Sequence, residues 1–410
     1  MNKKKILNDP VYGFINIPNE LIFDIIEHSY FQRLRRIKQL GLTDYVYPGA
    51  QHTRFHHAIG AMHLMDKALT SIESKGHEIS TEEYNAALVA ILLHDVGHGP
   101  FSHTLEFSLL NGVTHEQLSL WMMQRLNKEM SHDISLAIEM FQGKYHRPFF
   151  HQLISSQLDL DRLDYLKRDS FFTGVHEGMI GSERIIKMLE VVDEELVVEE
   201  KGIYSIENFL NARRLMYWQV YLHKVAVSAE VMLIEIVKRA KELAQQGVIV
   251  QATPALSIFL ERNIGTRDFE EDEDIIEIYS LLDDGDIWGS LKFWQNHDDL
   301  VLRRLSEMLL RRRLFKIEFF NEEIDEKLSE SLVAKVATQL QIELDQARYF
   351  VKTGAVSNSA YIATGGTINI LKKDGDLVDV AEATDLPNIK ALSQIVKKYY
   401  VCSPIQPLTA

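Results

Sequence analysis

Apolar residues recur at helical spacing through most of the chain, which indicates a mainly α fold. The start differs, because Pro10 and Gly13 interrupt an extended segment over residues 5–17. A helix follows, whose apolar positions are Leu21, Ile22, Ile25, Ile26 and Phe31. From about residue 56 to residue 169 the pattern is again helical, with turns expected at 75–76, 97–100 and 111–112. Residues 86–93 are apolar on every side, so we expect this helix at the centre of its domain.

The second half of the chain combines further helices with a few strands. The pattern predicts a hairpin over residues 195–205, turning at Lys201-Gly202, and helices over 206–246 and 298–313. Beyond them, short strand-like runs alternate with one or two helices: KIEFF, RYFVKTG, AYIATGG and TINILKKDG. We therefore expect four parts: an N-terminal segment and helix (1–50), a helical core (51–225), a helical extension (226–320) and a small α+β lobe (321–410).

The composition of these 410 residues, 46% hydrophobic and 25% charged, is that of a soluble globular protein. The chain lacks the run of ~18 uncharged apolar residues that a transmembrane helix needs, and no apolar segment follows the first lysines as in a signal peptide. Its only cysteine, Cys402, excludes an internal disulfide and fits a reducing, cytoplasmic location. The net charge of −15 argues against general binding to nucleic acids or anionic membranes.

Three conspicuous stretches are assigned no chemistry. Residues 268–286 are strongly acidic but lack the glycine and terminal glutamate of an EF-hand loop, so we interpret them as a solvated face. The run Arg311–Arg313 is interpreted as a solvated helix end, with a nucleic-acid patch as the alternative. The ATGG run near Ala363 lacks the Lys-Ser/Thr of a phosphate loop and is interpreted as a turn.

The densest chemistry surrounds His94-Asp95, which ends the predicted buried helix. Two ionisable groups at the end of an apolar helix are expected to be paired or ligated, because burying them alone is costly. Further imidazole and carboxylate groups lie within about sixty residues of one another: His52, His56, His57, His63, His98, His103, Glu106, His115 and Glu116. So many histidines beside an aspartate indicate a metal site or acid–base chemistry. Mixed His/Asp sets suit several divalent metals, so the residues alone leave the metal open.

A second group of carboxylates lies on the helix expected around residues 155–169. Asp161, Tyr165 and Asp169 are four residues apart and share one face over about 12 Å, roughly the length of a nucleoside. Asp159, Asp161 and Asp164 are all candidate metal ligands, and at least one of them is expected to be an ordinary surface carboxylate. On a third helix, four residues at near-helical spacing are candidates for the same cleft, with a plain surface stripe as the alternative: Arg213, Tyr217, Tyr221 and Lys224.

These residues resemble a known family. His57, His94-Asp95 and Asp161 match the H…HD…D signature of HD-domain metal-dependent phosphohydrolases. The resemblance is closest to the branch that contains the SAM-and-HD-domain dNTP triphosphohydrolases and the bacterial dGTPases. It rests on ordered blocks between residue 5 and about residue 225: QRLRRIKQLG, YPGAQHTRFHHAIG, LLHDVGHGPFSH, THEQ and DLDRLDYLKRD. An HD-type helical core at 51–225 is therefore expected.

The resemblance implies a role for each matching residue. The divalent metal (Mn, Fe, Zn, Ni or Mg) would be bound by His57, His94, Asp95 and Asp161. His115 would be the general acid or base, supported by His98 and Glu106. The substrate-binding residues would be Arg54, His103, Arg162 and Arg213 for the triphosphate, Tyr165, Asp169 and Tyr221 for the sugar, and Gln39 and Leu40 near the base. Thr114-x-x-Gln117 predicts a capping box that places His115 in a first helical turn, where a nearby carboxylate such as Glu106 would offset the helix dipole.

Regulated members of this branch bind an activating nucleotide near their N-terminal segment and form homotetramers. The positions that match such a site are Lys5, Ile6, Asn8, Glu27 and Arg35, although Glu27 stands where an aspartate reads guanine in those members. Other departures remove no ligand. Arg162 stands where some members have a lysine, which keeps the charge but changes the geometry. His56 replaces an acidic residue that is common before the metal histidine, and Glu106 stands where an aspartate also occurs.

The expected function is thus metal-dependent hydrolysis of a dNTP to a deoxynucleoside and inorganic triphosphate. A metal ion would offset phosphate charge and lower the pKa of bound water, and arginines would stabilise charge on the phosphate oxygens. One alternative is another HD-type activity on nucleotides, such as a nucleotidase or a phosphodiesterase. A second is a nucleotide-sensing or nucleic-acid-binding regulator that uses the same pocket without turnover.

Overall fold

Helices α3 (Arg54–Glu73), α4 (Thr81–Leu93) and α9 (Leu160–Thr173) form the centre of the molecule in the computed structural model. The structure describes residues 5–358, 367–385 and 396–405. Helix α3 packs along both α4 and α9, and α4 also packs against α7 (Ser135–Phe141). Every residue of α4 from Ala86 to Leu93 is buried, which confirms the predicted central helix. The fold is mainly α, as predicted.

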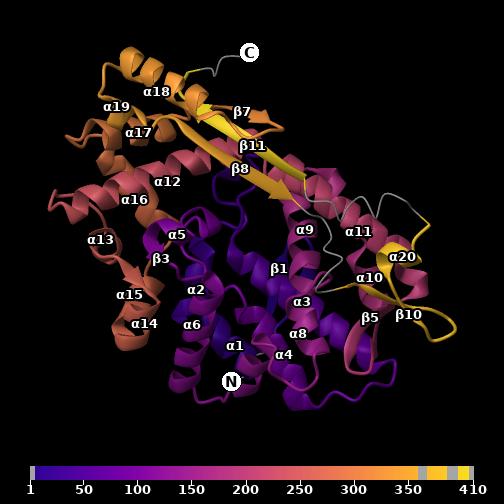
Figure 1. Ribbon diagram of the computed structural model, residues 1–410. Helices are drawn as coiled ribbons and strands as arrows, with labels where there is room; N and C mark the ends of the chain where they lie inside the picture. The colour runs from indigo at the N-terminus through magenta and orange to yellow at the C-terminus, as the bar shows by residue number, and fades with distance from the viewer. Residues whose placement is uncertain (1–4, 359–366, 386–395, 406–410) are drawn as a thin grey trace.

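Further helices surround this centre (Figure 1). Those before residue 216 are α1 (Glu20–Glu27), α2 (Ser29–Gln32), α5 (Glu106–Leu109), α6 (His115–Glu129), α8 (Phe149–Ile154), α10 (Ser182–Met188) and α11 (Ile203–Met216). Those after it are α12 (Lys224–Gln245), α13 (Pro254–Glu261), α14 (Thr266–Glu271), α15 (Glu273–Ser280), α16 (Asp284–Trp294), α17 (Leu300–Leu310), α18 (Glu326–Leu340), α19 (Leu344–Ala347) and α20 (Val380–Ala383). Single turns of tighter helix lie at Arg33–Arg36, Gly41–Tyr45, Ser102–Thr104, His176–Gly178 and Glu200–Gly202, and a π-helical turn at Tyr217–Tyr221 joins α11 to α12.

The extended N-terminal segment is a β-hairpin of β1 (Ile6–Asp9) and β2 (Gly13–Asn16). Leu7 faces Ile15 across the two strands, and Ile15 is buried. Gly13 at the turn has a φ of +75°, a conformation that glycine adopts without strain. Strand β2 of this hairpin packs against helix α3 of the centre.

The hairpin predicted over residues 195–205 does not form, and residues 189–199 form one instead. Its strands are β4 (Leu189–Val192) and β5 (Glu195–Glu199), with the turn at Asp193-Glu194 rather than at Lys201-Gly202. Residues 203–205, which were predicted to be its second strand, instead begin helix α11. Both turn residues, Asp193 and Glu194, have positive φ, 51° and 64°. The prediction missed this turn because the sequence has no glycine there, which is the residue that usually marks such a turn.

The C-terminal strands join two different sheets. Strand β11 (Val396–Ser403) lies between β7 (Lys316–Phe320) and β8 (Lys352–Asn358), antiparallel to both. Strand β9 (Asn369–Leu371) pairs in parallel with β5, and β10 (Leu377–Asp379) completes that sheet. A two-residue pairing of β3 (Leu110–Asn111) with β6 (Ile264–Gly265) links α5 to the helical extension. The run AYIATGG and the turn predicted near Ala363 lie outside the described residues.

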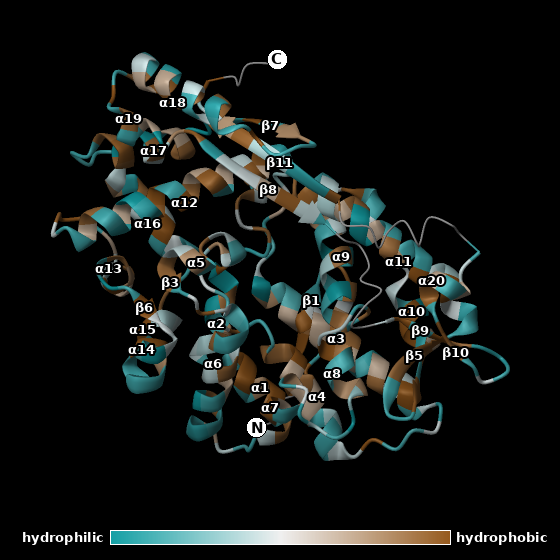
Figure 2. Cartoon of the chain, in the orientation of Figure 1, coloured by the Kyte–Doolittle hydropathy of each residue, from teal (hydrophilic) through white to brown (hydrophobic). Residues whose placement is uncertain are grey.

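The acidic stretch 268–286 is mostly on the surface, and Figure 2 shows α14 as hydrophilic. One member contradicts the prediction of a solvated face. Asp284 is buried, and its carboxylate accepts hydrogen bonds from the backbone nitrogens of Lys38 (2.9 Å) and Phe101 (2.8 Å). This carboxylate therefore ties α16 to the loop that follows His94-Asp95.

Within the described residues, no helix combines the length with the apolar character needed to cross a membrane.

Candidate metal centre and acid–base group

Four side chains from the three central helices point toward one another. They are His57 on α3, His94 and Asp95 directly after α4, and Asp161 in the first turn of α9. The Nε2 atom of His57 lies 3.1 Å from Asp161 Oδ1 and 3.8 Å from Asp95 Oδ2, and that of His94 lies 3.6 Å and 3.3 Å from Oδ1 of the same two carboxylates. Ligand atoms about 2.1 Å from one metal ion lie roughly 3.0–3.6 Å apart. The donor atoms of His57, His94 and Asp161 therefore lie close enough to share one metal ion, and Asp95 presents its carboxylate 3.3 Å and 3.8 Å from the two imidazoles.

The two imidazole rings are oriented as metal ligands are. Nδ1 of His57 lies 2.8 Å from Asp164 Oδ2, and Nδ1 of His94 lies 2.6 Å from the carbonyl oxygen of Ile91. With its proton on Nδ1, each ring presents the lone pair of Nε2, and both Nε2 atoms are buried without a hydrogen-bond partner. These two orphaned nitrogens, beside two carboxylates, fit a divalent cation.

Burial and the neighbouring ionisable side chains shift the pKa values of His57, Asp161 and Asp95. Burial opposes protonation of His57, but the carboxylates of Asp161 and Asp164 outweigh it and raise its pKa to about 10. Burial also opposes ionisation of Asp161, yet the imidazoles of His57 and His94 hold its pKa below the usual range. Burial likewise opposes ionisation of Asp95, but its neighbours His94, His98 and Arg54 hold its pKa well below the usual value, so both carboxylates are ionised at neutral pH.

Buried contacts fix the loop after His94-Asp95. The guanidinium of Arg33, which is fully buried, donates hydrogen bonds to the carbonyl oxygens of Val96 and His98, both at 2.8 Å. A Cβ at Gly97 would lie 2.2 Å from the backbone nitrogen of Ser119, so only glycine fits where this loop meets α6. Sequence reasoning missed Arg33, because its role depends on contacts with residues more than sixty positions away.

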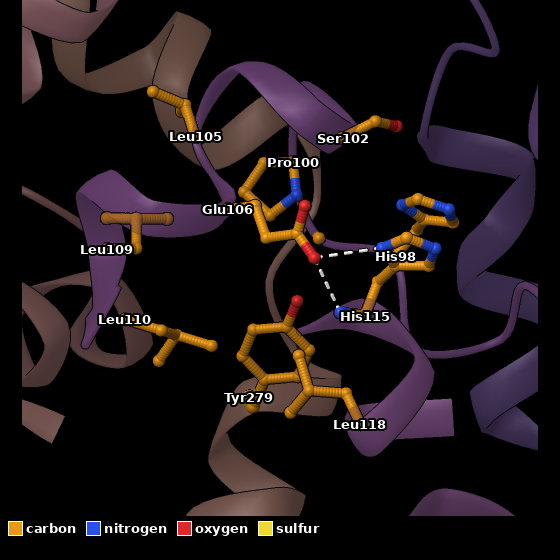
Figure 3. A pocket seen from close by; sticks show the side chains of 11 residues that line it. His98, Pro100, Ser102, Leu105, Glu106, Leu109, Leu110, His115, Leu118 and Tyr279 are labelled. Atoms are coloured by element: carbon orange, nitrogen blue, oxygen red, sulfur yellow. Dashed lines mark hydrogen bonds and ion pairs between the residues drawn. The ribbon is translucent and has the colours of Figure 1, made fainter. Parts of the chain in front are cut away.

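A histidine–glutamate pair lies beside His57, His94, Asp95 and Asp161, the metal-type cluster. Oε1 of Glu106 accepts hydrogen bonds from the backbone nitrogen (2.6 Å) and Nδ1 (2.8 Å) of His115, as Figure 3 shows. The ring of His98 stacks on that of His115 with centroids 3.9 Å apart, and its Nε2 lies 3.4 Å from Asp95 Oδ1. The predicted capping box of Thr114 and Gln117 is confirmed, so His115 is in the first turn of α6.

The charges around this pair are set by burial and hydrogen bonding. Burial opposes ionisation of Glu106, but hydrogen bonds with His103 and His115 keep its pKa well below the usual range. Burial, followed by the charge of Arg54, holds the pKa of His98 well below its ordinary value, so His98 is neutral at pH 7. His103 is exposed and contacts Glu106 Oε2 at 3.5 Å. Tyr279, which sequence reasoning missed, lines the same pocket and donates to the carbonyl oxygen of Gly97 at 3.0 Å.

Asp161, Tyr165 and Asp169, the row along α9, contact residues from other elements. Asp169 is buried, and its two oxygens contact Nε2 of His52 (2.6 Å) and the hydroxyl of Tyr221 (2.8 Å). The ring of Tyr221 meets that of Tyr165 edge to face, with centroids 6.0 Å apart. His52 was noted in the sequence as one of many histidines, without a place in the site.

Of the predicted triphosphate contacts, Arg54 contacts the cluster directly, through Asp95. Arg54 is buried, with Nε donating to Ser102 Oγ at 2.7 Å and Nη1 donating to Asp95. Arg162 forms an ion pair with Asp159, and Arg213 donates to Gln157 Oε1 at 3.1 Å. Gln39 and Leu40 lie beside the start of α3, because the backbone nitrogen of Gln39 donates to the carbonyl oxygen of His52 at 3.0 Å.

The expectation that one of Asp159, Asp161 and Asp164 is a surface carboxylate was wrong. Asp159 is fully buried and caps α9, accepting from the backbone nitrogens of Ser156 (2.8 Å) and Arg162 (2.7 Å). Asp164 is also fully buried and contacts His57 rather than the cluster itself. Both roles depend on tertiary contacts that the spacing of the three aspartates does not contain.

The residues proposed for an activator site and the basic run lie on the surface. The former, all exposed, are Lys5, Ile6, Asn8, Glu27 and Arg35. In the run 311–313, Arg311 pairs with Glu307 at 3.1 Å and Arg312 donates to the carbonyl oxygen of Tyr45, which agrees with a helix end. Lys224, expected on the same face as Arg213, is exposed at the start of α12.

The sequence matches two family models. Residues 54–169 match the HD domain, a range that contains all four residues of the metal-type cluster, and residues 180–252 match the HD associated region. An uncharacterized protein of Bacillus subtilis is 33% identical over 333 residues, which is 78% of this chain and 73% of that protein. The deoxynucleoside triphosphate triphosphohydrolase SAMHD1 homolog of Dictyostelium discoideum is 35% identical over 249 residues, 56% of this chain. The match covers 48% of that enzyme, so the chain spans about half its length.

Solved structures extend the similarity to the whole chain. A phosphohydrolase from Bacteroides thetaiotaomicron superposes with a TM-score of 0.94 at 55% identity, covering 98% of this chain and 99% of the other. A hypothetical protein from Aquifex aeolicus superposes with a TM-score of 0.71 at 28% identity, covering 98% and 96%. The HD match over the cluster, the Bacillus relative and the Bacteroides structure agree, and the chain belongs to the HD-domain phosphohydrolase family.

Proposed function

We propose that this hydrolase is a metal-dependent deoxynucleoside triphosphate triphosphohydrolase, which converts a dNTP to a deoxynucleoside and inorganic triphosphate. One observation carries the proposal: the donor atoms of His57, His94 and Asp161 lie within 4.8 Å of one another, with Asp95 beside both histidines, between the His115–Glu106 pair and the α9 residues Tyr165 and Asp169. Similar proteins of Dictyostelium discoideum and human are deoxynucleoside triphosphate triphosphohydrolases, which supports the choice of substrate.

In the proposed reaction, the oxygen of water bonds to the α-phosphorus, the bond from that phosphorus to O5′ breaks, and O5′ takes up a proton. His57, His94, Asp95 and Asp161 would hold the divalent cation. Bound there, such a cation supplies positive charge to the phosphate and lowers the pKa of water. Which of Mn, Fe, Zn, Ni or Mg binds is not selected by these ligand types.

His115 is the proposed proton donor to O5′. The ionised carboxylate of Glu106 accepts the Nδ1 proton of His115 and so keeps Nε2 available for transfer. The same carboxylate places a negative charge beside the first turn of α6, where the helix dipole alone would oppose a protonated imidazole. His98 stacks on His115 and restricts the rotation of its ring.

The remaining residues are proposed to bind the substrate. Arg54, His103, Arg162 and Arg213 would bind the triphosphate, because guanidinium groups pair with phosphate oxygens in fixed geometry. Asp169, held by His52 and Tyr221, would accept a hydrogen bond from the sugar, and Tyr165 would pack against it. Gln39 and Leu40 would lie near the base.

Two further features belong to the same proposal. An activating nucleotide would bind at the exposed N-terminal positions Lys5, Ile6, Asn8, Glu27 and Arg35, and the protein would act in the cytoplasm as a homo-oligomer, most simply a tetramer. Because these residues lie on the surface, a neighbouring copy of the chain could complete the site.

Product analysis tests the proposal. The metal-loaded protein is incubated with each dNTP, singly and mixed, and the products are separated by chromatography, with Asp95→Ala as the control. Deoxynucleoside and inorganic triphosphate, both absent from the control, are the expected result, and faster turnover in mixtures would reveal activation. A monophosphate or free phosphate would replace the proposal with a different HD-type hydrolysis, and nucleotide binding without turnover would replace it with a regulator.

A further inference from the structure

The N-terminal β-hairpin is connected to the candidate metal centre through buried charged side chains. Asp9, the last residue of β1, uses both carboxylate oxygens. Its Oδ1 accepts hydrogen bonds from the backbone nitrogens of Val11 (2.9 Å) and Tyr12 (3.0 Å), and so holds the turn of the hairpin. Its Oδ2 accepts a hydrogen bond from Nη1 of Arg168 on α9 at 2.7 Å.

The connection continues through α9 to a proposed metal ligand. Arg168 is fully buried, and its Nε and Nη2 donate to the two oxygens of Asp164 at 2.9 Å and 3.0 Å. Oδ2 of Asp164 lies 2.8 Å from Nδ1 of His57, whose Nε2 points into the cluster. Asp9 therefore acts on His57 through Arg168 and Asp164.

The Arg168–Asp164 ion pair is tightly packed against Gly60 and Tyr12. A Cβ at Gly60 of α3 would lie 2.1 Å from both Nη2 of Arg168 and Oδ1 of Asp164, so the pair occupies the space that a side chain would take. Glycine inside a helix costs roughly 1 kcal/mol relative to alanine, and here it admits the ion pair. The ring of Tyr12, at the hairpin turn, lies 5.5 Å from the guanidinium carbon of Arg168.

The burial of these charges indicates more than a fold-stabilising role. Buried ion pairs and triads are often no more stabilising than apolar residues of the same volume, because removing charges from water is costly. Two aspartates around one arginine also leave a net negative charge, and it lies on the Nδ1 side of His57. A hydrogen-bonded carboxylate at that position fixes the orientation of a ligating imidazole and strengthens its bond to a metal.

We propose that Asp9 is a positioning residue for His57, so that the N-terminal hairpin is part of the metal centre although it contributes no ligand. The inference rests on the proposed metal centre and adds to it a segment more than forty residues before the first ligand. Orientation of His57 then depends on the hairpin being folded, and folding of the hairpin depends in turn on the metal.

The test is the affinity of the chelator-stripped protein for Mn²⁺, measured by titration calorimetry on Asp9→Asn. Asparagine can still accept the two backbone hydrogen bonds of the turn but loses the charge that faces Arg168. Loss of a group that directly supports a ligating histidine weakens metal binding by about 10–100-fold. Asp9 acts through two intermediates, so we expect a weakening of about threefold to tenfold.

Asp299→Asn is the matched control. Asp299 also combines a capping role with an arginine pair, because it accepts from the backbone nitrogen of Leu302 (2.8 Å) and from Nη2 of Arg239 (2.6 Å), away from the metal centre. It should lower the melting temperature and leave the Mn²⁺ affinity unchanged. Equal Mn²⁺ affinity in wild type and Asp9→Asn would overturn the proposal alone, whereas absence of Mn²⁺ binding by the wild type would overturn the metal centre as well.

Hydrogen exchange supplies a readout on the unmodified protein. Because coupling between two sites is reciprocal, Mn²⁺ should slow amide exchange at Leu7 and Ile15 in the hairpin. Exchange that stays the same at these residues, while the amides near His57 become protected, would contradict the proposal.

Discussion

His57 and His94 show how one carboxylate and one backbone carbonyl can orient two metal ligands. Each ring holds its Nδ1 proton against an oxygen, of Asp164 in one case and of Ile91 in the other, and so presents Nε2 before any metal arrives. The carboxylates that attract a cation also attract a proton, which makes the two competitors for the same nitrogen.

Metal binding should therefore depend on pH. In the metal-free protein, the pKa of His57 is raised to about 10, so its stabilising contribution is present below the unfolded value of about 6.5 and is lost as pH rises toward 10. A metal must displace this proton, so we expect affinity to rise by about tenfold per pH unit between pH 6 and pH 9. Calorimetry in buffers of different ionisation enthalpy should record about one proton released. No release in this range would exclude a protonated His57.

Glu106 provides a second prediction at this scale. Glu106→Gln removes the charge that accepts the Nδ1 proton of His115, and we expect kcat to fall by about 10²–10⁴-fold with the metal content unchanged. The measurement is steady-state dNTP hydrolysis beside metal analysis. Glu139→Gln is the control, because Glu139 is exposed on α7 and is not one of the two carboxylates, Glu106 and Glu116, that contact His115. Equal losses in the two variants would remove Glu106 from the proposed mechanism.

At the scale of elements, Glu83 stabilises the start of α4 through hydrogen bonds with Ser80, Tyr145 and Arg147. Ser80 and Glu83 form a capping box, and Oε1 of Glu83 also accepts from Tyr145 and Arg147, both at 2.8 Å. Burial opposes ionisation of Glu83, but the hydrogen bonds from Arg147, Ser80 and Tyr145 lower its pKa to about 2. This contact secures the far end of the helix that carries His94.

We predict that Glu83→Gln lowers the free energy of unfolding by about 1–3 kcal/mol at pH 7. Because the folded pKa is depressed, the contribution is present above the unfolded value of about 4.3 and is lost as pH falls toward 2. Urea denaturation of the variant and the wild type, from pH 7 to pH 3, should show the difference narrowing below about pH 4.5. The control is Glu82→Gln, an exposed residue in the same turn, for which a similar loss would point to general charge effects.

Local patterns predicted the elements whose cause is local. The all-apolar run of α4, the capping box at Thr114 and the interruption at Gly13 each depend on neighbours in the sequence, and each was interpreted correctly. The turn at Asp193-Glu194 has no glycine, whereas Lys201-Gly202 has one, and the hairpin turn was therefore predicted at the wrong place.

Local sequence patterns could not predict which residues meet through long-range contacts. Asp164 is buried because Arg168 and His57 surround it, and Asp284 because it binds backbone nitrogens that precede it by 246 and 183 residues. Within the candidate site, the sequence placed together the four proposed ligands and the His115–Glu106 pair, but not Arg33, His52 or Tyr279. The boundaries of the four expected parts stay a prediction.

For the whole molecule, the proposed metal joins three central helices and should stabilise the fold. At a free metal concentration 100 times Kd, binding contributes about 2.7 kcal/mol. With an entropy of unfolding of about 2.1 cal/mol/K per residue, this corresponds to a rise of roughly 3 °C in Tm for a chain of this length. Scanning calorimetry with and without chelator measures it. Asp161→Ala should show no metal-dependent shift, and a shift that persists in it would place the metal elsewhere.

The pairing of β9 with β5 and of β11 between β7 and β8 also bears on how the chain is made. A ribosome releases the central helices α3, α4 and α9 before it releases the strands that complete these two sheets. The edges of β5 and β7 stay unpaired until β9 and β11, which come later in the chain, are synthesised, and unpaired strand edges favour association with other chains. We therefore expect C-terminally shortened fragments to aggregate during expression, even when they retain every residue of the proposed active site.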